Sequence, residues 1–249
     1  MSQTPFRFKQ FAVAHDKCAM KVNTDGVLVG AWAEVSNVKR ILDIGTGTGV
    51  IALMMAQRNK DAFIDAIDID ESAYLQAKDN FEQSPWADRL QAIHTALQQF
   101  IFVQQHPAGA QVETVATQGY DLIISNPPYF IDDFKSGKPL KDIARHSLAL
   151  NYADLLAGTD KLLAPSGRAC LVLPIFNLAL LQTLAAKHSL FVCRLTEVTA
   201  VIGKQPYLAL IQLQRREKPI EKTTLCIQNA QGGFTDDYKA LTREFYLKF

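Results

Sequence analysis

Short apolar runs alternate with amphipathic stretches from residue 40 onward. Arg40 to Gly45 has the pattern of a buried strand ending at a glycine, Val50 to Arg58 that of an apolar helix, and Phe63 to Asp68 that of a second strand. Glu71 to Phe81 then predicts a helix, with Asp70 placed to cap its first amides. This alternation predicts a parallel sheet with helices on both faces.

The later elements complete an α/β fold of Rossmann-like type. The prolines after Ser125 stop a strand, because proline cannot extend a ladder. The last two strands are separated by little more than a loop, which suits an antiparallel pair. We therefore expect a mostly parallel sheet with an antiparallel last strand. The remaining elements are strands at Leu90–His94, Tyr120–Ser125, Arg168–Leu173, Leu190–Val198 and Leu208–Gln214, a helix at Asp154–Leu163 and a turn at Pro165-Ser166-Gly167.

Two segments lack clear periodicity and predict surface loops. Gln104 to Gly119 mixes Pro, Gly, Ala, Gln and Thr, whereas Ile131 to Arg145 is rich in charge. The second is the better candidate for a loop that contacts substrate. A chain of 249 residues fits one domain, so we expect a single domain over residues 1–249, with the core sheet in 36–216 and an extension in 217–249.

Composition narrows the class of protein. The chain is 48% apolar and 20% charged, as in soluble globular domains, and its net charge of +1 does not favour a strongly basic nucleic-acid coat protein. A basic face on a balanced surface stays open. The four cysteines are scattered and predict reduced core residues, with no metal site. No apolar run has membrane-spanning length and no signal peptide is evident, so we expect a cytoplasmic protein.

A glycine-rich loop, Asp43-Ile44-Gly45-Thr46-Gly47-Thr48-Gly49, lies where the first strand turns into the first helix. Its glycines allow a ligand to approach the backbone at the carboxyl edge of the sheet. The dinucleotide fingerprint places its third glycine one residue later, which disfavours a nicotinamide oxidoreductase. Asp68 ends the second strand, where a carboxylate accepts hydrogen bonds from the ribose hydroxyls of an adenosine. A tight turn and a solvated acid are the alternatives.

Asn126-Pro127-Pro128-Tyr129 is the most specific signal in the chain. The exocyclic amino nitrogen of adenine is a poor nucleophile because its lone pair is delocalised into the ring. Two acceptors aimed at the two amino hydrogens localise that pair, and the Asn126 side-chain oxygen and the Pro127 carbonyl are of this kind. Pro128 stiffens the turn, and Tyr129 offers a ring on which the base stacks. An incidental proline turn is the alternative.

The glycine loop, Asp68 and the tetrad, in this order, resemble the class I, seven-stranded amino methyltransferases over residues 20 to 215. More narrowly, the chain resembles, nearly end to end, the bacterial enzymes that methylate the adenine next to the anticodon of valine tRNA. The residues of this second resemblance are Phe8-Lys9-Gln10-Phe11, His15-Asp16, Met20-Lys21-Val22, Thr24-Asp25-Gly26, Gly30-Ala31-Trp32, Gln83-Ser84-Pro85-Trp86, Ala240-Leu241-Thr242 and Phe245-Tyr246-Leu247.

The resemblance implies S-adenosylmethionine as cofactor, a tRNA anticodon stem-loop as partner, a monomer, and no metal or membrane. It also implies that residues 1–35 close over the cofactor. The catalytic residues are then Asn126, Pro127, Pro128 and Tyr129. The cofactor residues are Lys21, Thr24, Asp25, Asp43, Gly45, Thr46, Gly47, Gly49, Asp68, Ala96 and Asn126.

One position departs from the family. Leu97 stands where the family usually has an acid that contacts the cofactor's adenine, and a leucine side chain accepts no hydrogen bond. Backbone groups around Ala96 taking over this contact, or weaker cofactor binding, are the two alternatives.

Two alternative functions stay open. One keeps the chemistry but acts on another RNA or on a protein glutamine amide, as in release-factor methyltransferases, which carry a helical domain before the first strand; about forty residues precede it here. Another is a non-catalytic RNA-binding module that retains cofactor.

Basic residues are candidates for phosphate contacts around the mouth of the site, with solvated charge as the alternative. They are Arg7, Lys9, Lys17, Lys21, Arg215, Arg216, Lys218 and Lys222.

Overall fold

The computed structural model describes residues 4–18, 20–105, 119–128 and 151–249. Apart from residues 104, 105 and 119, the two segments predicted as surface loops lie outside this part of the chain. So does Tyr129, the last residue of the predicted catalytic tetrad.

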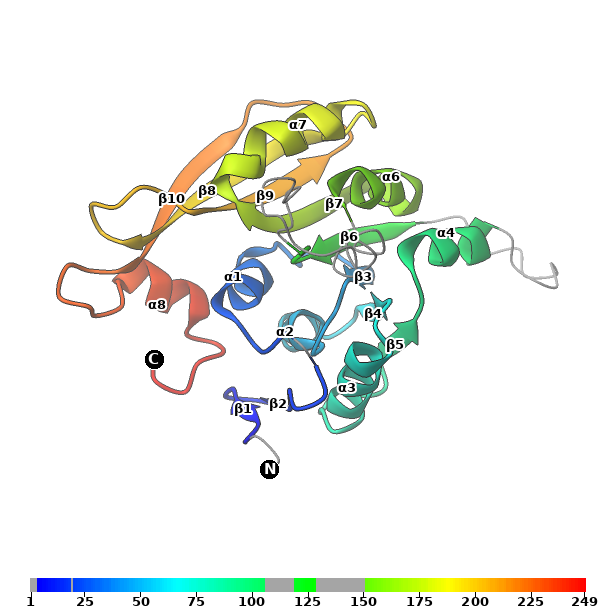
Figure 1. Cartoon of the computed structure of the whole chain (residues 1–249), viewed down its shortest axis with the longest axis horizontal. Coiled ribbons are helices and arrows are strands. Elements are labelled where there is room, and N and C mark those ends of the chain that lie inside the picture. Colours follow the sequence, from blue (N-terminus) through cyan, green and yellow to red (C-terminus); the bar gives the residue numbers. More distant parts are fainter. Residues whose placement is uncertain (1–3, 19, 106–118, 129–150) are drawn as a thin grey trace, which may run out of the picture.

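A mixed sheet forms the centre of the molecule, with strand order β10-β8-β9-β7-β6-β3-β4-β5 (Figure 1). Of its eight strands, only β9 runs against its neighbours, because β7 and β8 pair with it in antiparallel fashion and all other pairs are parallel. The strands are β3 (Arg40–Ile44), β4 (Phe63–Asp68), β5 (Leu90–His94), β6 (Tyr120–Ser125), β7 (Leu163–Pro174), β8 (Phe191–Val201), β9 (Leu208–Gln214) and β10 (Glu221–Gln228).

The predicted α/β class and the antiparallel β9 are confirmed, but the strand number is wrong: within the described residues the sheet already has eight strands, not seven. The additional strand, β10, comes from the C-terminal extension and pairs with β8. It lies at the end of the sheet, and only Leu225 and Ile227 among its residues are buried apolar side chains. An edge strand with so little buried surface gives no apolar run to detect.

The predicted turn at Pro165-Ser166-Gly167 is also wrong, since these residues lie within β7. The pairing of β6 with β7 shifts register here, from Tyr120 opposite Leu163 to Leu122 opposite Arg168. The chain therefore bulges without leaving the sheet, and the turn-forming residues mark the bulge.

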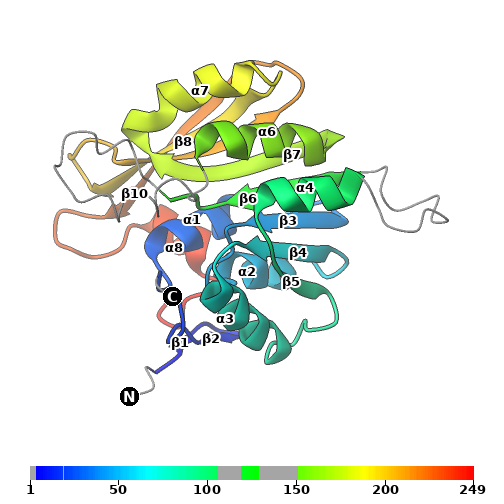
Figure 2. The same ribbon diagram turned by 45° about the vertical axis from the view of Figure 1, so that its right-hand side comes forward.

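Helices cover both faces of the sheet (Figures 1 and 2). Side chains alternate along each strand, so Ile41 of β3 joins the apolar core on one face and Leu42 joins the core on the other. The first face carries α1 (Thr24–Trp32), α2 (Val50–Arg58) and α3 (Glu71–Glu82); the second carries α4 (Leu97–Gln105), α6 (Tyr152–Leu162), the short helix η1 (Ile175–Asn177) and α7 (Leu178–Ala186).

The two ends of the chain pack together beside α1. Strands β1 (Phe6–Arg7) and β2 (Ala12–Val13) form a small hairpin, and helix α8 (Asp236–Thr242) lies against α1 and β10. The Lys9 amide donates to the Phe245 carbonyl at 2.8 Å. The Phe8 ring stacks on Tyr246 with centroids 6.0 Å apart.

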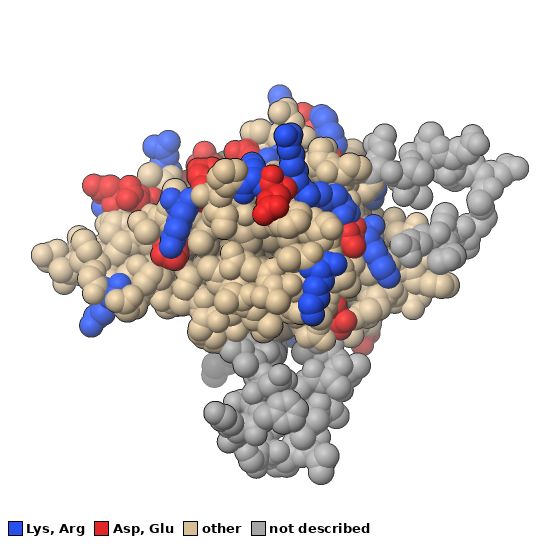
Figure 3. All heavy atoms as spheres, turned by 90° about the horizontal axis from the view of Figure 1, so that it is seen from above, with Lys and Arg blue, Asp and Glu red and all other residues tan. Residues whose placement is uncertain are grey.

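Charge on the described surface is mixed, and Figure 3 shows Lys and Arg interspersed with Asp and Glu on the face seen there. Several of these charges are paired, as in Lys222 with Glu197 and Arg215 with Asp160. Among the described helices, none is both long and apolar enough to cross a bilayer. Nor do three or more His, Cys, Asp or Glu side chains gather as a metal site within that part of the chain.

The packing of the two ends predicts a stability effect. Phe245 is 1% exposed, whereas the nearby Leu247 is 62% exposed. We expect Phe245→Ala to lower the free energy of unfolding by about 3 to 5 kcal/mol, because it removes a buried ring and leaves a cavity. Leu247→Ala is the control and should change it by less than about 0.5 kcal/mol. Urea unfolding followed by circular dichroism measures both, and equal effects would contradict this packing.

Candidate active site

The glycine-rich loop joins β3 to α2 at the carboxyl edge of the sheet. Gly45, Gly47 and Gly49 have φ angles of 71°, 57° and 81°, in the left-handed region that favours glycine. At Gly49, a Cβ atom would also lie 2.5 Å from Cε1 of Phe81. Above Gly45, by contrast, an added Cβ would meet nothing within 4 Å. The loop is therefore packed against α3 at its end and open at its beginning.

Asp43 is the fully buried carboxylate of the loop. The Thr46 hydroxyl donates to its Oδ2 at 2.6 Å. Its Oδ1 is buried and has no hydrogen-bond partner within the described part of the chain. Burial raises the pKa of Asp43 to about 7, and the neighbouring charge of Asp68 adds to this effect.

Asp68 ends β4, beside the loop. Its Oδ2 accepts from the Gly47 amide at 2.8 Å and its Oδ1 from the Asp70 amide at 2.9 Å. A carboxylate oxygen has two lone pairs, so each oxygen retains one acceptor site. Burial raises the pKa of Asp68 above its usual range. Asp70 caps α3 as predicted, because its Oδ1 accepts from the Ala73 amide at 2.8 Å.

Asn126 follows the last residue of β6, the strand next to β3. Asp43 lies opposite Ile124 in this parallel pair. One residue further on, the Ser125 hydroxyl donates to the Ile44 carbonyl at 2.7 Å. The next residues are Asn126 after β6 and Gly45 after β3, so the register brings the start of the tetrad beside the start of the glycine loop. Pro127 is buried, and Asn126 and Pro128 are partly buried.

The predicted N-terminal residues reach the same edge through α1. Thr24 and Asp25 form its first turn, and the Asn23 side chain caps it by accepting from the Gly26 amide at 2.8 Å. A Cβ added to Gly26 would lie 3.7 Å from Val50, at the start of α2. The first turns of α1 and α2 are therefore neighbours. Lys21 is exposed.

The carboxyl end of β5 is held to Asp68, because the Thr95 amide donates to the Asp68 carbonyl at 2.9 Å. Ala96, a predicted cofactor residue, is next in the chain. Leu97 is 4% exposed and belongs to the core beneath α4 and α6, where its Cδ2 would lie 2.6 Å from a Cβ on Gly158. The leucine thus packs in the interior. In this chain the position contributes to the core and offers the cofactor edge no polar side chain.

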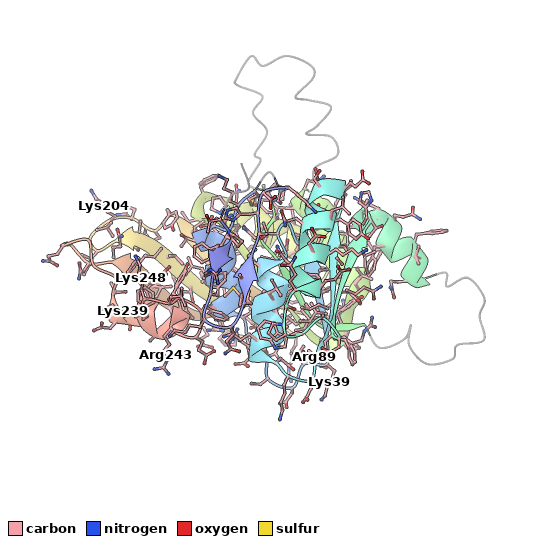
Figure 4. All side chains as sticks on the ribbon, turned by 90° about the horizontal axis from the view of Figure 1, so that it is seen from below. Lys39, Arg89, Lys204, Lys239, Arg243 and Lys248 are labelled. Carbon is pink, nitrogen blue, oxygen red and sulfur yellow. The ribbon has the colours of Figure 1, made fainter. Side chains whose placement is uncertain are left out.

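The predicted basic rim is wrong for the residues after β9. That strand runs against β7, so Arg215, Arg216 and Lys218 follow its end at the amino edge of the sheet, opposite the glycine loop. Lys9 donates to the carbonyls of Arg243 and Phe249, and Lys17 pairs with Asp79. Figure 4 labels basic residues seen from below. Lys39 and Arg89 precede β3 and β5, and Lys204, Lys239, Arg243 and Lys248 lie around α8 and the β8–β9 hairpin. The Arg89 guanidinium is partly buried and donates to the carbonyls of Ala56, Asn59 and Ala62.

Two residues at this edge were not identified from the sequence. Ser125 links β6 to β3, and Tyr207 precedes β9, whose reversed direction brings its first residues to the carboxyl edge. Partial burial, followed by the charge of Asp25, raises the pKa of Tyr207 to about 12. Neither residue type is distinctive in sequence, because both roles depend on the neighbouring strand.

Comparison with known proteins agrees with this geometry. The family described as the methyltransferase small domain matches residues 26–174, which include the glycine loop and Asn126. In fold, the chain is similar to a predicted O-methyltransferase from Agrobacterium tumefaciens, with a TM-score of 0.63 and 16% identity over 89% of this chain and 96% of that one. It is also similar to a methyltransferase subunit of a type I restriction-modification system from Streptococcus thermophilus, with a TM-score of 0.54 and 14% identity over 83% of this chain and 47% of that one.

Similarity in sequence extends over the whole chain. The tRNA1(Val) (adenine(37)-N6)-methyltransferase of Aeromonas hydrophila is 43% identical over 98% of this chain and 97% of its own length. The protein of the same name from Parabacteroides distasonis is 43% identical over all of both chains. The chain therefore belongs to the tRNA1(Val) (adenine(37)-N6)-methyltransferase family, within the methyltransferase small-domain fold.

Proposed function

We propose that this protein transfers a methyl group from S-adenosylmethionine to the exocyclic amino nitrogen of the adenine next to the anticodon of a valine tRNA, in the cytoplasm. The observation that carries the proposal is the Ser125–Ile44 hydrogen bond at 2.7 Å, which sets Asn126 beside Gly45. The Asn126 side-chain amide, which would bind the amino group of the substrate, is thus next to the glycine-rich loop, which suits the methyl donor.

The residues at the loop fit S-adenosylmethionine. The space over Gly45 is open, so a ligand can approach the backbone there. The partly buried carboxylate of Asp68 retains acceptor sites for ribose hydroxyls, and Asp68 and Asp25 favour a cationic ligand, while Asp43 supports the loop from beneath through Thr46. When bound, the cofactor supplies a methyl group activated by a sulfonium. Lys21, Thr24, Thr46, Gly47, Gly49 and Ala96 complete the proposed cofactor residues.

The chemical task of this chain is to prepare the amine. The side-chain oxygen of Asn126 and the carbonyl of Pro127 accept the two amino hydrogens and shift the nitrogen lone pair out of the ring. Pro127 and Pro128 keep both acceptors stiff, because proline fixes φ. Tyr129 stacks on the base. No general base is needed before transfer, and alignment of the reacting atoms supplies much of the rate.

The relatives favour tRNA over the other substrates. All the relatives compared above in sequence carry a tRNA adenine methyltransferase name and match nearly end to end. Lys204, at the tip of the β8–β9 hairpin, is exposed at the same edge as the glycine loop and suits a phosphate contact. A base in an anticodon loop costs least to swing out of its stack.

The first prediction concerns Asn126. We expect Asn126→Ala to lower the rate constant of methyl transfer by roughly 100-fold to 1,000-fold, because one of two rigid acceptors is lost. Cofactor affinity, measured by calorimetry with S-adenosylhomocysteine, should change less than about threefold. Methyl incorporation is measured with labelled cofactor and unmodified valine tRNA, followed by mass spectrometry of the nucleosides.

Gln98→Ala is the matched control, since Gln98 is an exposed amide in the first turn of α4. It should leave both readings unchanged. Full methyl-transfer activity in Asn126→Ala would contradict the proposed role of the tetrad. Absence of N6-methyladenosine with wild-type protein, despite cofactor binding, would remove adenine as the substrate.

The second prediction concerns Asp43, whose folded pKa is raised from 3.8 to about 7. The protonated form of a carboxyl group with a raised pKa contributes to the free energy of unfolding. This contribution is fully present below about pH 4 and is lost as pH rises through about 7. The side chain in Asp43→Asn does not ionise, so the variant does not lose this contribution as pH rises. Its amide oxygen can still accept a hydrogen bond from the Thr46 hydroxyl. We therefore expect its stability relative to wild type to increase by up to about 3 kcal/mol from pH 5 to pH 8.

Urea unfolding of the ligand-free proteins at several pH values measures this difference. A difference that stays constant with pH would show that Asp43 is ionised at no cost. Asp61→Asn, at an exposed carboxylate on the amino edge of the sheet, serves as the control and should show no such trend.

A further inference from the structure

Helix α3 buries two amide side chains on the face that packs toward the glycine loop. Gln76 is 1% exposed and Asn80 is 3% exposed, and their spacing places them one turn apart on the same side of the helix. A buried primary amide is costly unless both its oxygen and its amino group are hydrogen-bonded. The partners of these two side chains therefore indicate what their burial achieves.

Asn80 joins two segments that are far apart in the chain. Its Oδ1 accepts from the Ala14 amide at 2.9 Å, and its Nδ2 donates to the Ala14 carbonyl at 2.9 Å. The same Nδ2 donates to the Thr48 carbonyl, inside the glycine loop, at 2.8 Å. One side chain thus clamps the backbone of residues 14–18, here called the N-terminal strap, to the loop.

The strap is held to α3 at two further points and ends over the loop. Gln76 Oε1 accepts from the Lys17 amide at 2.8 Å, and the Lys17 ammonium pairs with Asp79. Cys18 Sγ lies 4.0 Å from the position that a Cβ on Gly47 would take. Among the α3 side chains in the described part of the chain that hold the strap, Asn80 is the one that is also hydrogen-bonded to the loop.

The consequence of this arrangement is pre-organisation. The loop backbone is left-handed at its three glycines, a conformation that loses much chain entropy on folding. Asn80 fixes the carbonyl between the last two of them. Through Ala14 it also fixes the strap, which leads to Thr24 and Asp25. A ligand that binds to ordered groups does not have to order them itself, so affinity rises.

We infer that Asn80 is a positioning residue that couples the N-terminal strap to the glycine loop and thereby sets the affinity for the cofactor. The inference rests on the proposed function, since it takes S-adenosylmethionine as the ligand of the loop. It assigns to a residue of α3, outside the loop and the tetrad, a specific effect on cofactor binding and none on the methyl-transfer chemistry.

The test measures S-adenosylhomocysteine binding by calorimetry and amide hydrogen exchange in the ligand-free protein. For Asn80→Ala we expect the dissociation constant to rise at least about tenfold, because the ligand must then order the loop and the strap that the lost hydrogen bonds held. Exchange should accelerate both in residues 14–18 and in residues 46–49. In steady-state assays, the KM for cofactor should rise while kcat and the KM for tRNA stay within about threefold of wild type.

Two variants on the same helix are the matched controls. Gln76→Ala frees the Lys17 amide while Asn80 still holds Ala14, and it leaves the loop untouched. Exchange should therefore accelerate within residues 14–18 only, and the dissociation constant should change less than about threefold. Asp79→Asn removes the exposed Lys17 ion pair, which adds little to the hold on the strap, and should change neither reading. Asn80→Asp keeps the acceptor for the Ala14 amide but loses both donated bonds, and decides the matter if Asn80→Ala does not fold.

Wild-type affinity in a folded Asn80→Ala or Asn80→Asp protein would overturn the inference. An equal loss of affinity in Gln76→Ala would overturn it too, because ordering of the strap alone would then suffice. Failure of the wild-type protein to bind S-adenosylhomocysteine would instead count against the proposed function. The two failures are therefore distinguishable.

Discussion

The Ser125 hydroxyl, by donating to the Ile44 carbonyl, joins the ends of two parallel strands at the point where each stops being a strand. Beyond this bond β3 continues as the glycine loop and β6 continues as the Asn-Pro-Pro turn. Parallel strands end at one edge of a sheet, and a 2.7 Å bond between neighbours leaves little freedom in their relative height. The two halves of the site depend on this constraint for their alignment.

Near the aligned strand ends, the protein buries polar groups that lower its free energy of unfolding. Asp43 and Asp68 are both held at raised pKa by burial beside the loop, and Asn80 and Gln76 are buried amides on a helix. A core built only for stability would use apolar side chains at such positions. These four residues lie near the glycine loop, whereas the core under α6 and α7 is mainly apolar.

Sequence patterns were sufficient to predict the bounds of a helix or strand where the apolar periodicity and the turn-forming residues at its ends agree. Val50–Arg58, Phe63–Asp68 and Leu208–Gln214 have the predicted bounds, because long apolar runs end at glycine, acid or loop residues. The same reasoning missed β10, whose edge position needs little apolar surface.

Prediction from the sequence also placed the basic residues after β9 at the wrong edge of the sheet, because their position depends on the direction of that strand. Roles that consist of a bond to a distant backbone, as for Ser125 and Asn80, leave no local pattern to detect. For Leu97, sequence comparison with the family pointed to a missing acid, whereas the contact with Gly158 explains what the leucine does instead.

The left-handed glycines of the loop have a broader consequence for how this protein tolerates change. Their backbone is part of the folded structure, so the entropy of arranging it belongs to the folding equilibrium. A replacement at Gly49, where Phe81 leaves no room for a side chain, would reduce the amount of intact protein before it reduced the turnover of each molecule. In a cell, such damage would look like low abundance.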